Sequence, residues 1–282
     1  MPAKSIHLLV IVGISVLFPF SCNDDNRASG VMLNFDFARR EIKTVHPQLQ
    51  EISGIHYLND GQKIAAVNDE DGIIFILDFS GKQQSRLQKF GRQGDYEDIT
   101  ADSYYYYILQ SRGRILRVPK TGVPDSVDYF ELPSGDNDFE SMYMDAARNR
   151  LVLICKSCRK AEKDKMIPAF CFDLASMQFQ QQPCFMMDTR KVRMLLNEKN
   201  LECRPSAAAI HPVLNKLFVL CSVGKVLVIC DTEGRVEEAF RLDPAFFPQP
   251  EGITFAPNGD MFISNEGQDQ LGTIIRFPFV AP

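Results

Sequence analysis

Five oxygen-bearing residues recur along the chain at nearly regular spacing, and their chemistry suits a hard cation. Three are glutamates and two are serines: Ser53, Glu97, Glu140, Ser206 and Glu251. If the fold brings these residues together, the carboxylates repel and raise one another's pKa unless a cation joins them. Oxygen ligands without sulfur or nitrogen favour Ca²⁺ over Zn²⁺. Asp69 and Glu266 end other expected strands and add further oxygens. We therefore expect a calcium site whose ligands include Glu97, Glu140, Glu251, Asp69 and Glu266.

A second interpretation of the same residues needs no metal. The glutamates could accept hydrogen bonds from backbone N–H groups where each repeat begins, or pair with cations. Lys156 and Arg112 stand at comparable strand ends and are the cations available for such pairs. The sequence leaves both interpretations open.

The histidines give little support for catalysis. His7 lies in the apolar leader, whereas His56 and His211 lie in expected strands without a carboxylate partner nearby in the sequence. Hydrogen-bonded strand or turn histidines are the simpler interpretation. The chain has no Gly-x-Ser-x-Gly, Walker or His-Glu-x-x-His motif. We assign no catalytic residue.

The elements that must position these residues form five copies of one pattern, a polar turn followed by three apolar strands. Equivalent positions are separated by 44, 43, 66 and 45 residues: Gly54, Asp98, Ser141, Ala207 and Gly252. A period near 40–45 residues with several strands per unit predicts a five-bladed β-propeller, an all-β fold. A two-sheet β-sandwich is the alternative fold.

Two segments fall outside the regular repeat. The long third step contains residues 187–200, which are polar and helix-prone and should lie outside the blade. The fifth repeat has only three strands, and residues 31–37 form an unassigned alternating strand near the other end of the chain. We expect this N-terminal strand to close the fifth blade and cover its edge.

The N-terminus is typical of an exported lipoprotein. An apolar run over residues 6–20 is too short to span a bilayer comfortably and suits a secretory signal. Ser21 and Cys22 follow it, as at a bacterial lipoprotein cleavage site, and an acidic run comes next. We expect residues 1–21 to be a signal peptide, Cys22 to carry the lipid, 22–30 to be a tether and 31–282 to be one propeller domain. A cleaved signal with an incidental cysteine, or an uncleaved anchor, is the alternative.

The cysteines suit an oxidising compartment. The chain has eight, and lipidation of Cys22 leaves an odd number, so at least one thiol stays free without an intermolecular bridge. Exported proteins favour disulfides over a zinc or redox site. We expect one structural disulfide within the third repeat, with Cys221 and Cys230 as small core residues. Pairing stays open among Cys155, Cys158, Cys171, Cys184 and Cys203.

Charge excludes one class of partner. The chain carries 31 Lys and Arg against 36 Asp and Glu, a net charge of −5, and has no basic run. Binding to phosphate backbones needs clustered cations, so we expect no nucleic-acid partner.

Several phrases resemble the SdiA-regulated family of bacterial propeller proteins, distantly similar to NHL-repeat propellers. They include EISGIHY, AVNDEDGIIFILDFSGK and PQPEGITFAPNGDMFISNE, and the resemblance covers about residues 31–282. It implies a five-bladed propeller and a calcium ion, with no established reaction. More distant propellers use a channel Ca²⁺ to hydrolyse lactones or phosphoesters.

We therefore expect a non-catalytic binding module, stabilised by a central calcium ion. It should sit in the cell envelope, lipid-anchored to the outer membrane on its periplasmic or external side, and bind a small ligand or an envelope protein. The alternative is a calcium-dependent hydrolase, lactonase-like or phosphoesterase-like, that uses the central channel.

Overall fold

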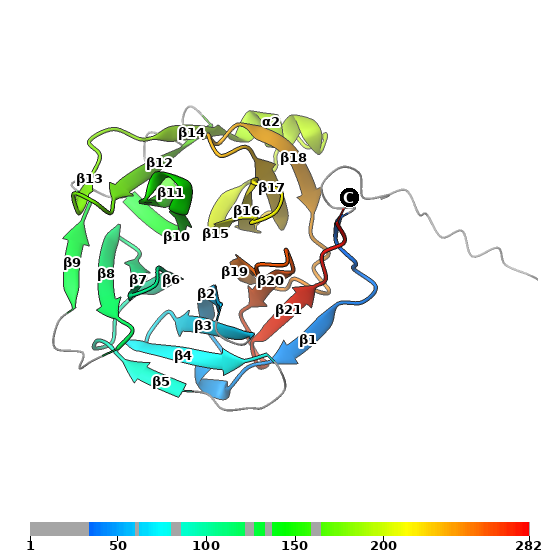
Figure 1. Cartoon of the computed structure of the whole chain (residues 1–282). Coiled ribbons are helices and arrows are strands. Elements are labelled where there is room, and N and C mark those ends of the chain that lie inside the picture. The colour runs from blue at the N-terminus through cyan, green and yellow to red at the C-terminus, as the bar shows by residue number, and fades with distance from the viewer. Residues whose placement is uncertain are drawn as a thin grey trace, which may run out of the picture.

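A computed structural model describes residues 34–59, 62–79, 86–121, 127–132, 137–158 and 165–281. These residues form five antiparallel sheets arranged as blades in a ring, so the predicted five-bladed β-propeller is confirmed (Figure 1). The predicted signal peptide, Cys22 and the tether lie outside the described residues. Within the described part of the chain, no helix has the length and apolar character needed to cross a bilayer.

Each blade runs outward from an innermost strand that lines the channel. Blade 1 consists of β2 (Ile52–Leu58), β3 (Lys63–Asn68), β4 (Ile73–Asp78) and β5 (Arg86–Lys89). Blade 2 consists of β6 (Tyr96–Ala101), β7 (Tyr105–Gln110), β8 (Arg114–Pro119) and β9 (Asp128–Glu131). Blade 4 consists of β15 (Arg204–Ile210), β16 (Leu217–Val223), β17 (Val226–Cys230) and β18 (Val236–Arg241). The innermost strands of neighbouring blades contact one another around the ring.

Blade 3 is the irregular blade, and it contains the long insertion. It begins with two strands, β10 (Asn137–Asp145) and β11 (Arg150–Cys158), which are joined by the short 3-10 helix η3 (Ala146–Arg148). β12 (Met166–Asp173) then pairs with both β13 (Gln178–Phe179) and β14 (Phe185–Asp188). The helix α2 (Thr189–Leu195) follows at the outer rim beside β18 (Figure 1). The prediction that 187–200 lies outside the blade was wrong for residues 187–188, which belong to β14 and pair with β12.

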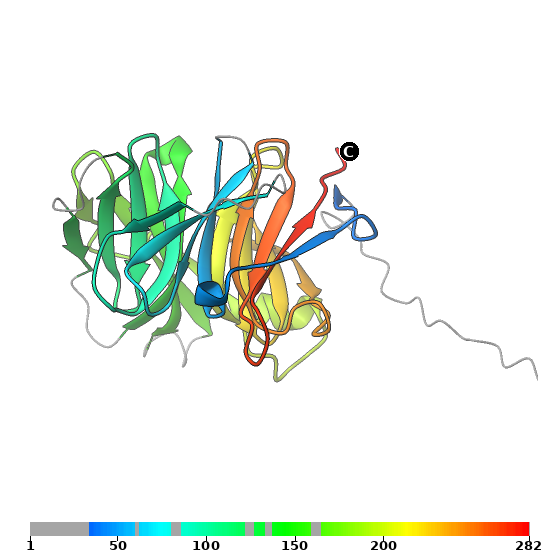
Figure 2. The ribbon, with the colours of Figure 1, turned by 90° about the horizontal axis from the view of Figure 1, so that it is seen from below.

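An N-terminal segment closes blade 5, but the predicted strand was misplaced. Blade 5 consists of β19 (Pro250–Phe255), β20 (Met261–Asn265), β21 (Thr273–Phe277) and, beside β21, β1 (Glu41–Thr44), as Figure 2 shows edge-on. Residues 31–33 of the predicted strand lie outside the described residues, and Phe35 forms only an isolated bridge to Phe279.

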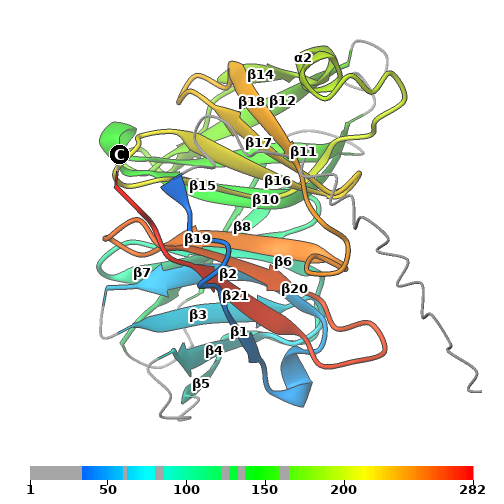
Figure 3. The ribbon, with the colours of Figure 1, turned by 90° about the vertical axis from the view of Figure 1, so that its right-hand side faces the viewer.

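The physical reason for this correction is the exposure of an outermost strand. Such a strand needs little apolar character, and β1 carries Glu41, which pairs with Arg276, together with mostly exposed side chains. The apolar residues before β1 serve packing instead: Phe35 is 5% exposed and contacts Phe279 edge-to-face. Figure 3 shows β1 beside β21. The chain continues from β1 through η2 (Pro47–Leu49) into β2.

The middle strands of the blades are buried on both faces. In β16 and β17 nearly every side chain is buried, and the same holds for residues 151–155 of β11. Strands covered by neighbouring sheets on both sides lose the apolar–polar alternation of a half-exposed strand. The continuous apolar runs of the sequence therefore predicted these strands correctly.

Disulfides are more numerous than predicted. Blade 3 has two, Cys155–Cys158 and Cys171–Cys184, instead of one. Cys221 is bonded to Cys203, so its prediction as a simple core residue was wrong, whereas Cys230 is a free, buried thiol. The strand register explains the error: Cys221 pairs across the sheet with Pro205, close to Cys203, a neighbourhood that the linear sequence does not show.

Candidate ligand-binding face

A β-bulge stands at the same place in each innermost strand. In four blades one residue is skipped in the ladder, and these residues are Glu97, Glu140, Ser206 and Glu251. In β2 the residues Ser53 and Gly54 together stand opposite Val67 alone. A bulge places an extra residue outside the regular alternation and redirects its side chain. All five oxygen-bearing residues picked out by spacing are thus bulge residues, or part of one.

These five residues line one cavity at the mouth of the channel where the innermost strands begin. The cavity has a volume of about 210 Å³, and Asp69, Glu266, Glu51, Asp95, Gln249 and Lys156 complete its lining. Every metal ligand predicted from sequence, Glu97, Glu140, Glu251, Asp69 and Glu266, therefore borders the same space. We call it the acidic cavity because seven carboxylates face one lysine there.

Burial and mutual repulsion raise the pKa values of three carboxyl groups that line the acidic cavity. Burial, together with the neighbouring Asp95 carboxylate, raises the pKa of Glu97 to about 8. Burial likewise raises the pKa of Glu251 to about 7, with a contribution from Glu266. For Asp69 burial and then Glu51 raise the pKa to about 6. Without a bound cation, Glu97 and part of the Glu251 population hold a proton near neutral pH.

Lys156 is the cation lining this cavity among the residues that the structure describes. Its ammonium pairs with Glu140, and both side chains are largely buried, 21% and 14% exposed. Its charge also lowers the pKa values of Glu97 and Glu251 against the effect of burial. One Glu140 oxygen and one Asp69 oxygen nonetheless stay buried without a hydrogen-bond partner. Lysine thus compensates only part of the negative charge.

The carboxylates do not lie as a ready-made metal cluster. Among the described residues, no three His, Cys, Asp or Glu side chains come together closely enough to hold an ion. The acidic cavity brings the predicted ligands to one space while leaving them apart, and Lys156 occupies part of it as the second interpretation of the sequence foresaw.

Sequence reasoning missed a second ring of polar residues at this mouth. Two positions before each bulge stand Glu51, Asp95, Asp138, Arg204 and Gln249, and three of them line the acidic cavity. The signal was present, because these residues follow the same spacing as the bulge residues. It was overlooked because only one position of the repeated pattern was compared across blades.

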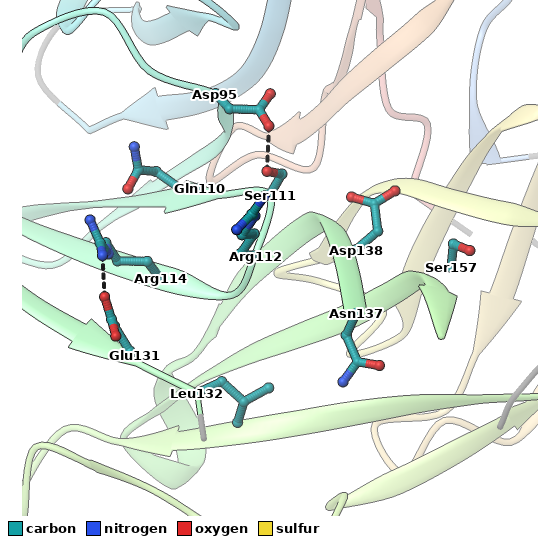
Figure 4. A pocket seen from close by; sticks show the side chains of 10 residues that line it. All are labelled: Asp95, Gln110, Ser111, Arg112, Arg114, Glu131, Leu132, Asn137, Asp138 and Ser157. Atoms are coloured by element: carbon teal, nitrogen blue, oxygen red, sulfur yellow. Dashed lines mark hydrogen bonds and ion pairs between the residues drawn. The ribbon is translucent and has the colours of Figure 1, made fainter. Parts of the chain in front are cut away.

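Arg112 lies beside the acidic cavity rather than in it. It borders a neighbouring hollow of about 980 Å³ between blades 2 and 3, where Asp95 lies on one side and Asp138 on the other (Figure 4). Ser111 donates a hydrogen bond to Asp95, and Arg114 pairs with Glu131 further out. Asp95 lines both hollows, so the two adjoin.

The opposite mouth of the channel has a different character. A cavity of about 400 Å³ there is lined by the far ends of all five innermost strands, mostly by apolar side chains such as Met142, Met144 and Phe255. His56 borders it, and burial lowers the pKa of His56 to about 4, so the ring is neutral. We call this space the apolar cavity.

The other described histidines are structural. His211 is fully buried: Nε2 donates to the Gly259 carbonyl, and Nδ1 accepts from the N–H groups of Val213 and Leu214. His46 Nδ1 accepts from Gln48 N–H and caps η2. Strand or turn bonding was the simpler prediction from sequence. It is confirmed for His211 and for His56, which lies in β2 with Nδ1 3.4 Å from Thr100 Oγ1. His56 reaches the channel at the mouth away from the glutamates.

Asp98 stands at the floor of the apolar cavity, deep in the channel. Its carboxylate is 3% exposed and accepts hydrogen bonds from the N–H groups of Ile99 and, in the next blade, Met142. Burial raises its pKa well above the usual range. Gly54 makes room for it, because a Cβ there would lie 2.4 Å from Asp98 Oδ1. The glycine of the first repeat is thus required by a close approach between blades.

Comparisons with known proteins agree on the fold. No family model and no curated protein match the chain. A gluconolactonase from Xanthomonas campestris superposes with a TM-score of 0.54 at 10% identity, over 89% of this chain and 93% of the other. A luciferin-regenerating enzyme gives 0.51 at 12% identity, over 84% of this chain and 95% of the other.

A protein of unknown function from Bacteroides thetaiotaomicron gives a TM-score of 0.53 at 11% identity, over 80% of this chain and 55% of the other. At such identities the likeness shows the β-propeller fold alone. The resemblance to the SdiA-regulated family is supported to that level and no further.

Proposed function

We propose that this protein is a non-catalytic binding module that takes up a cation in the acidic cavity. The observation that carries the proposal is the imbalance there: seven carboxylates, one lysine and raised pKa values for Glu97 and Glu251. Carboxylates that lose water and face one another are stabilised in their charged form by a bound cation. A bound cation would therefore stabilise the fold as well as mark the ligand-binding face.

Calcium is the cation that we propose. The lining offers carboxylates, the hydroxyls of Ser53 and Ser206 and the Gln249 amide. Ca²⁺ takes six to eight such oxygens in flexible geometry, so glutamate side chains can move to meet it. The unpartnered oxygens of Glu140 and Asp69 are the first two ligands to expect. Glu97, Glu251 and Glu266 would complete the set.

Two features support binding rather than hydrolysis. A hydrolytic calcium needs an open coordination position and a base that activates water, yet Lys156 stands among the glutamates and pairs with Glu140. His56, which reaches the channel, borders the apolar cavity rather than the acidic one. A calcium-dependent lactonase or phosphoesterase is therefore the less favoured alternative.

We further propose that the protein is exported, lipidated at Cys22 and held at the outer membrane as a member of the SdiA-regulated family. The signal-like residues 6–20 motivate this proposal. The three disulfides support it, because such bonds persist in oxidising compartments outside the cytosol. We propose a small ligand or an envelope protein as the partner of the acidic mouth.

The test is thermal unfolding of the purified protein in EDTA and in Ca²⁺, with a parallel screen of lactone and phosphoester hydrolysis. We expect Ca²⁺ to raise the melting temperature, because a ligand that binds only the folded state stabilises it. Glu251→Gln should lose most of this rise, whereas Asp269→Asn, an exposed matched control, should keep it.

Two results would contradict the proposal. An unchanged melting temperature in Ca²⁺ would remove the cation. Hydrolysis that Glu251→Gln abolishes without unfolding the protein would make it an enzyme.

A further inference from the structure

A second charged hollow lies between blades 3 and 4, next to the acidic cavity but of opposite sign. It has a volume of about 380 Å³, and its described lining holds four cations, Lys156, Lys165, Arg193 and Arg204, and one carboxylate, Glu202. Lys156 borders both this hollow and the acidic cavity, so the two adjoin. The chain as a whole carries a net charge of −5, so this local excess of positive charge is opposite in sign to the rest of the protein.

Among the residues that the structure describes, no carboxylate pairs with two of the four cations. Arg204 pairs with Glu202 at 3.3 Å, and Lys156 pairs with Glu140. The Arg193 side chain donates from Nε to the carbonyl of Leu201, which orients the guanidinium without compensating its charge. Within the described part of the chain, the Lys165 side chain makes no ion pair or hydrogen bond; it is exposed to the hollow.

The walls of the hollow are held by two disulfides. Cys158 and Cys203 both line it, bonded to Cys155 and Cys221. Lys156 lies inside the first disulfide loop, and Arg204 directly follows Cys203. Thr189 Oγ1 donates to the Lys165 carbonyl and holds that backbone against α2. These bonds fix the backbone that carries Lys156, Lys165 and Arg204, so less backbone entropy is lost when an anion binds there.

We propose that this hollow is a binding site for a small oxyanion, a phosphate or sulfate group, with Arg193 and Lys165 as its main contacts. A guanidinium presents paired N–H donors that match such oxygens, and an ammonium adds a compact charge. The site is separate from the acidic cavity and does not depend on what occupies that cavity. A ligand that carried both charges would reach across Lys156 into the two hollows at once.

The test is calorimetric titration of the purified protein with inorganic phosphate and with sulfate at low ionic strength. We expect saturable binding that Lys165→Gln and Arg193→Gln each weaken at least fivefold. Lys199→Gln removes one exposed cation from the same surface but outside the hollow, and it should bind phosphate as the wild type does. Melting temperatures identify any variant that fails to fold. If Arg193→Gln does not fold, Lys165→Gln alone carries the test, because Lys165 is exposed.

A phosphate group could also come from a lipid headgroup, so co-sedimentation with phosphatidylglycerol vesicles, against phosphatidylcholine vesicles, forms a second arm. The proposal commits to a soluble anion, because the cations line a hollow of limited volume. Vesicle binding that depends on Lys165, without saturable phosphate binding, would overturn it. Equal phosphate affinity in Lys165→Gln and Lys199→Gln would overturn it too, as would no binding at all.

The outcome is distinguishable from that of the calcium proposal. Lys165→Gln should leave the response to Ca²⁺ unchanged, and Glu251→Gln should leave phosphate binding unchanged. Loss of one response with the other intact therefore identifies which of the two hollows fails.

Discussion

The two mouths of the channel are built from the same five strands yet have opposite chemistry. Where the innermost strands begin, bulges turn Glu97, Glu140 and Glu251 into the acidic cavity. Where the same strands end, the ladders are regular and the apolar cavity is lined by residues such as Met142 and Phe255. A one-residue irregularity, repeated in every blade, thus separates a charged face from a neutral one on a single scaffold.

The two mouths differ in how many carboxylates share one space, seven in the acidic cavity and Asp98 in the apolar cavity. Buried carboxylates with raised pKa values destabilise the folded state unless protons or a cation compensate them. At the other mouth Thr254 accepts a hydrogen bond from Tyr57 N–H, whereas the buried hydroxyl of Tyr143 has no hydrogen-bond partner among the described residues. The gathering of carboxylates around one space, more than burial cost alone, is why we propose the acidic mouth as the functional end.

The largest effect is expected where the two mouths meet. Asp98→Ala removes the acceptor of two buried N–H groups, those of Ile99 and Met142. An unsatisfied buried donor costs about 1–3 kcal/mol, so we expect a loss of about 2–5 kcal/mol in the free energy of unfolding, measured by urea denaturation. Asp269→Ala, at an exposed carboxylate, is the control. A change below about 1 kcal/mol for Asp98→Ala would show that the blades do not depend on this tie.

We expect the acidic cavity to determine how the free energy of unfolding falls as the pH rises, the alkaline arm of the stability profile. Glu97 has a folded pKa of about 8, above its unfolded value of 4.5, so its folded form binds the extra proton. Its contribution to stability is present below pH 4.5 and is lost as the pH rises through about 8. In EDTA, Glu97→Gln should stabilise the protein by roughly 1–3 kcal/mol at pH 8 and leave it unchanged at pH 4.

The measurement is urea unfolding across this pH range. Equal stabilities of wild type and Glu97→Gln at pH 8 would show that the carboxyl is not strained. The same comparison in Ca²⁺ should reverse in sign, because the variant loses a ligand of the proposed ion.

The acid arm should belong in part to the apolar cavity. His56 has a folded pKa of about 4, below its unfolded value of 6.5, so the folded state resists its protonation. Stability is therefore lost as the pH falls from 6.5 towards 4, and His56→Gln should lessen this loss by roughly 1–2 kcal/mol. His211, with its pKa also lowered to about 4 by burial, accounts for a further share.

The two variants control for each other. Glu97→Gln should flatten only the alkaline arm and His56→Gln only the acid arm. If both variants altered the same arm, the assignment of the arms to opposite mouths would fail.

The smallest effect concerns a single hydrogen bond at the apolar mouth. Thr254→Val removes the hydroxyl that accepts from Tyr57 N–H, at 3.0 Å, while it keeps the side-chain volume. We expect a loss of about 1 kcal/mol, by urea denaturation, and an unchanged response to Ca²⁺. A lost calcium response would mean that the two mouths are coupled.

The fold was predictable from the sequence because the five repeats are regularly spaced, and such spacing can be recognised without knowing which residues contact one another. Gly54, Asp98, Ser141, Ala207 and Gly252 aligned on sequence spacing and occupy equivalent places in the five innermost strands. The closing strand was harder, because Glu41–Thr44 is an exposed edge with no apolar signature, whereas Phe35 belongs to packing.

The candidate site was predictable only in part. Spacing brought Glu97, Glu140 and Glu251 to one cavity, because bulges recur with the blades. Cross-strand facts were out of reach: the pairing of Cys203 with Cys221, the insertion of Lys156 beside Glu140 and the gathering of cations around Arg193 all depend on register. Such contacts join residues from separate strands, and their positions along the chain do not reveal them.

The central claim is tested most directly by titrating Ca²⁺ into the purified, EDTA-treated protein in a calorimeter. We predict one site per chain, lost when Glu97→Gln and Glu251→Gln are combined and retained in His56→Gln, which alters only the apolar mouth. Absence of binding heat at every pH tested would contradict the claim. Equal Ca²⁺ affinity in the double variant and the wild type would contradict it too.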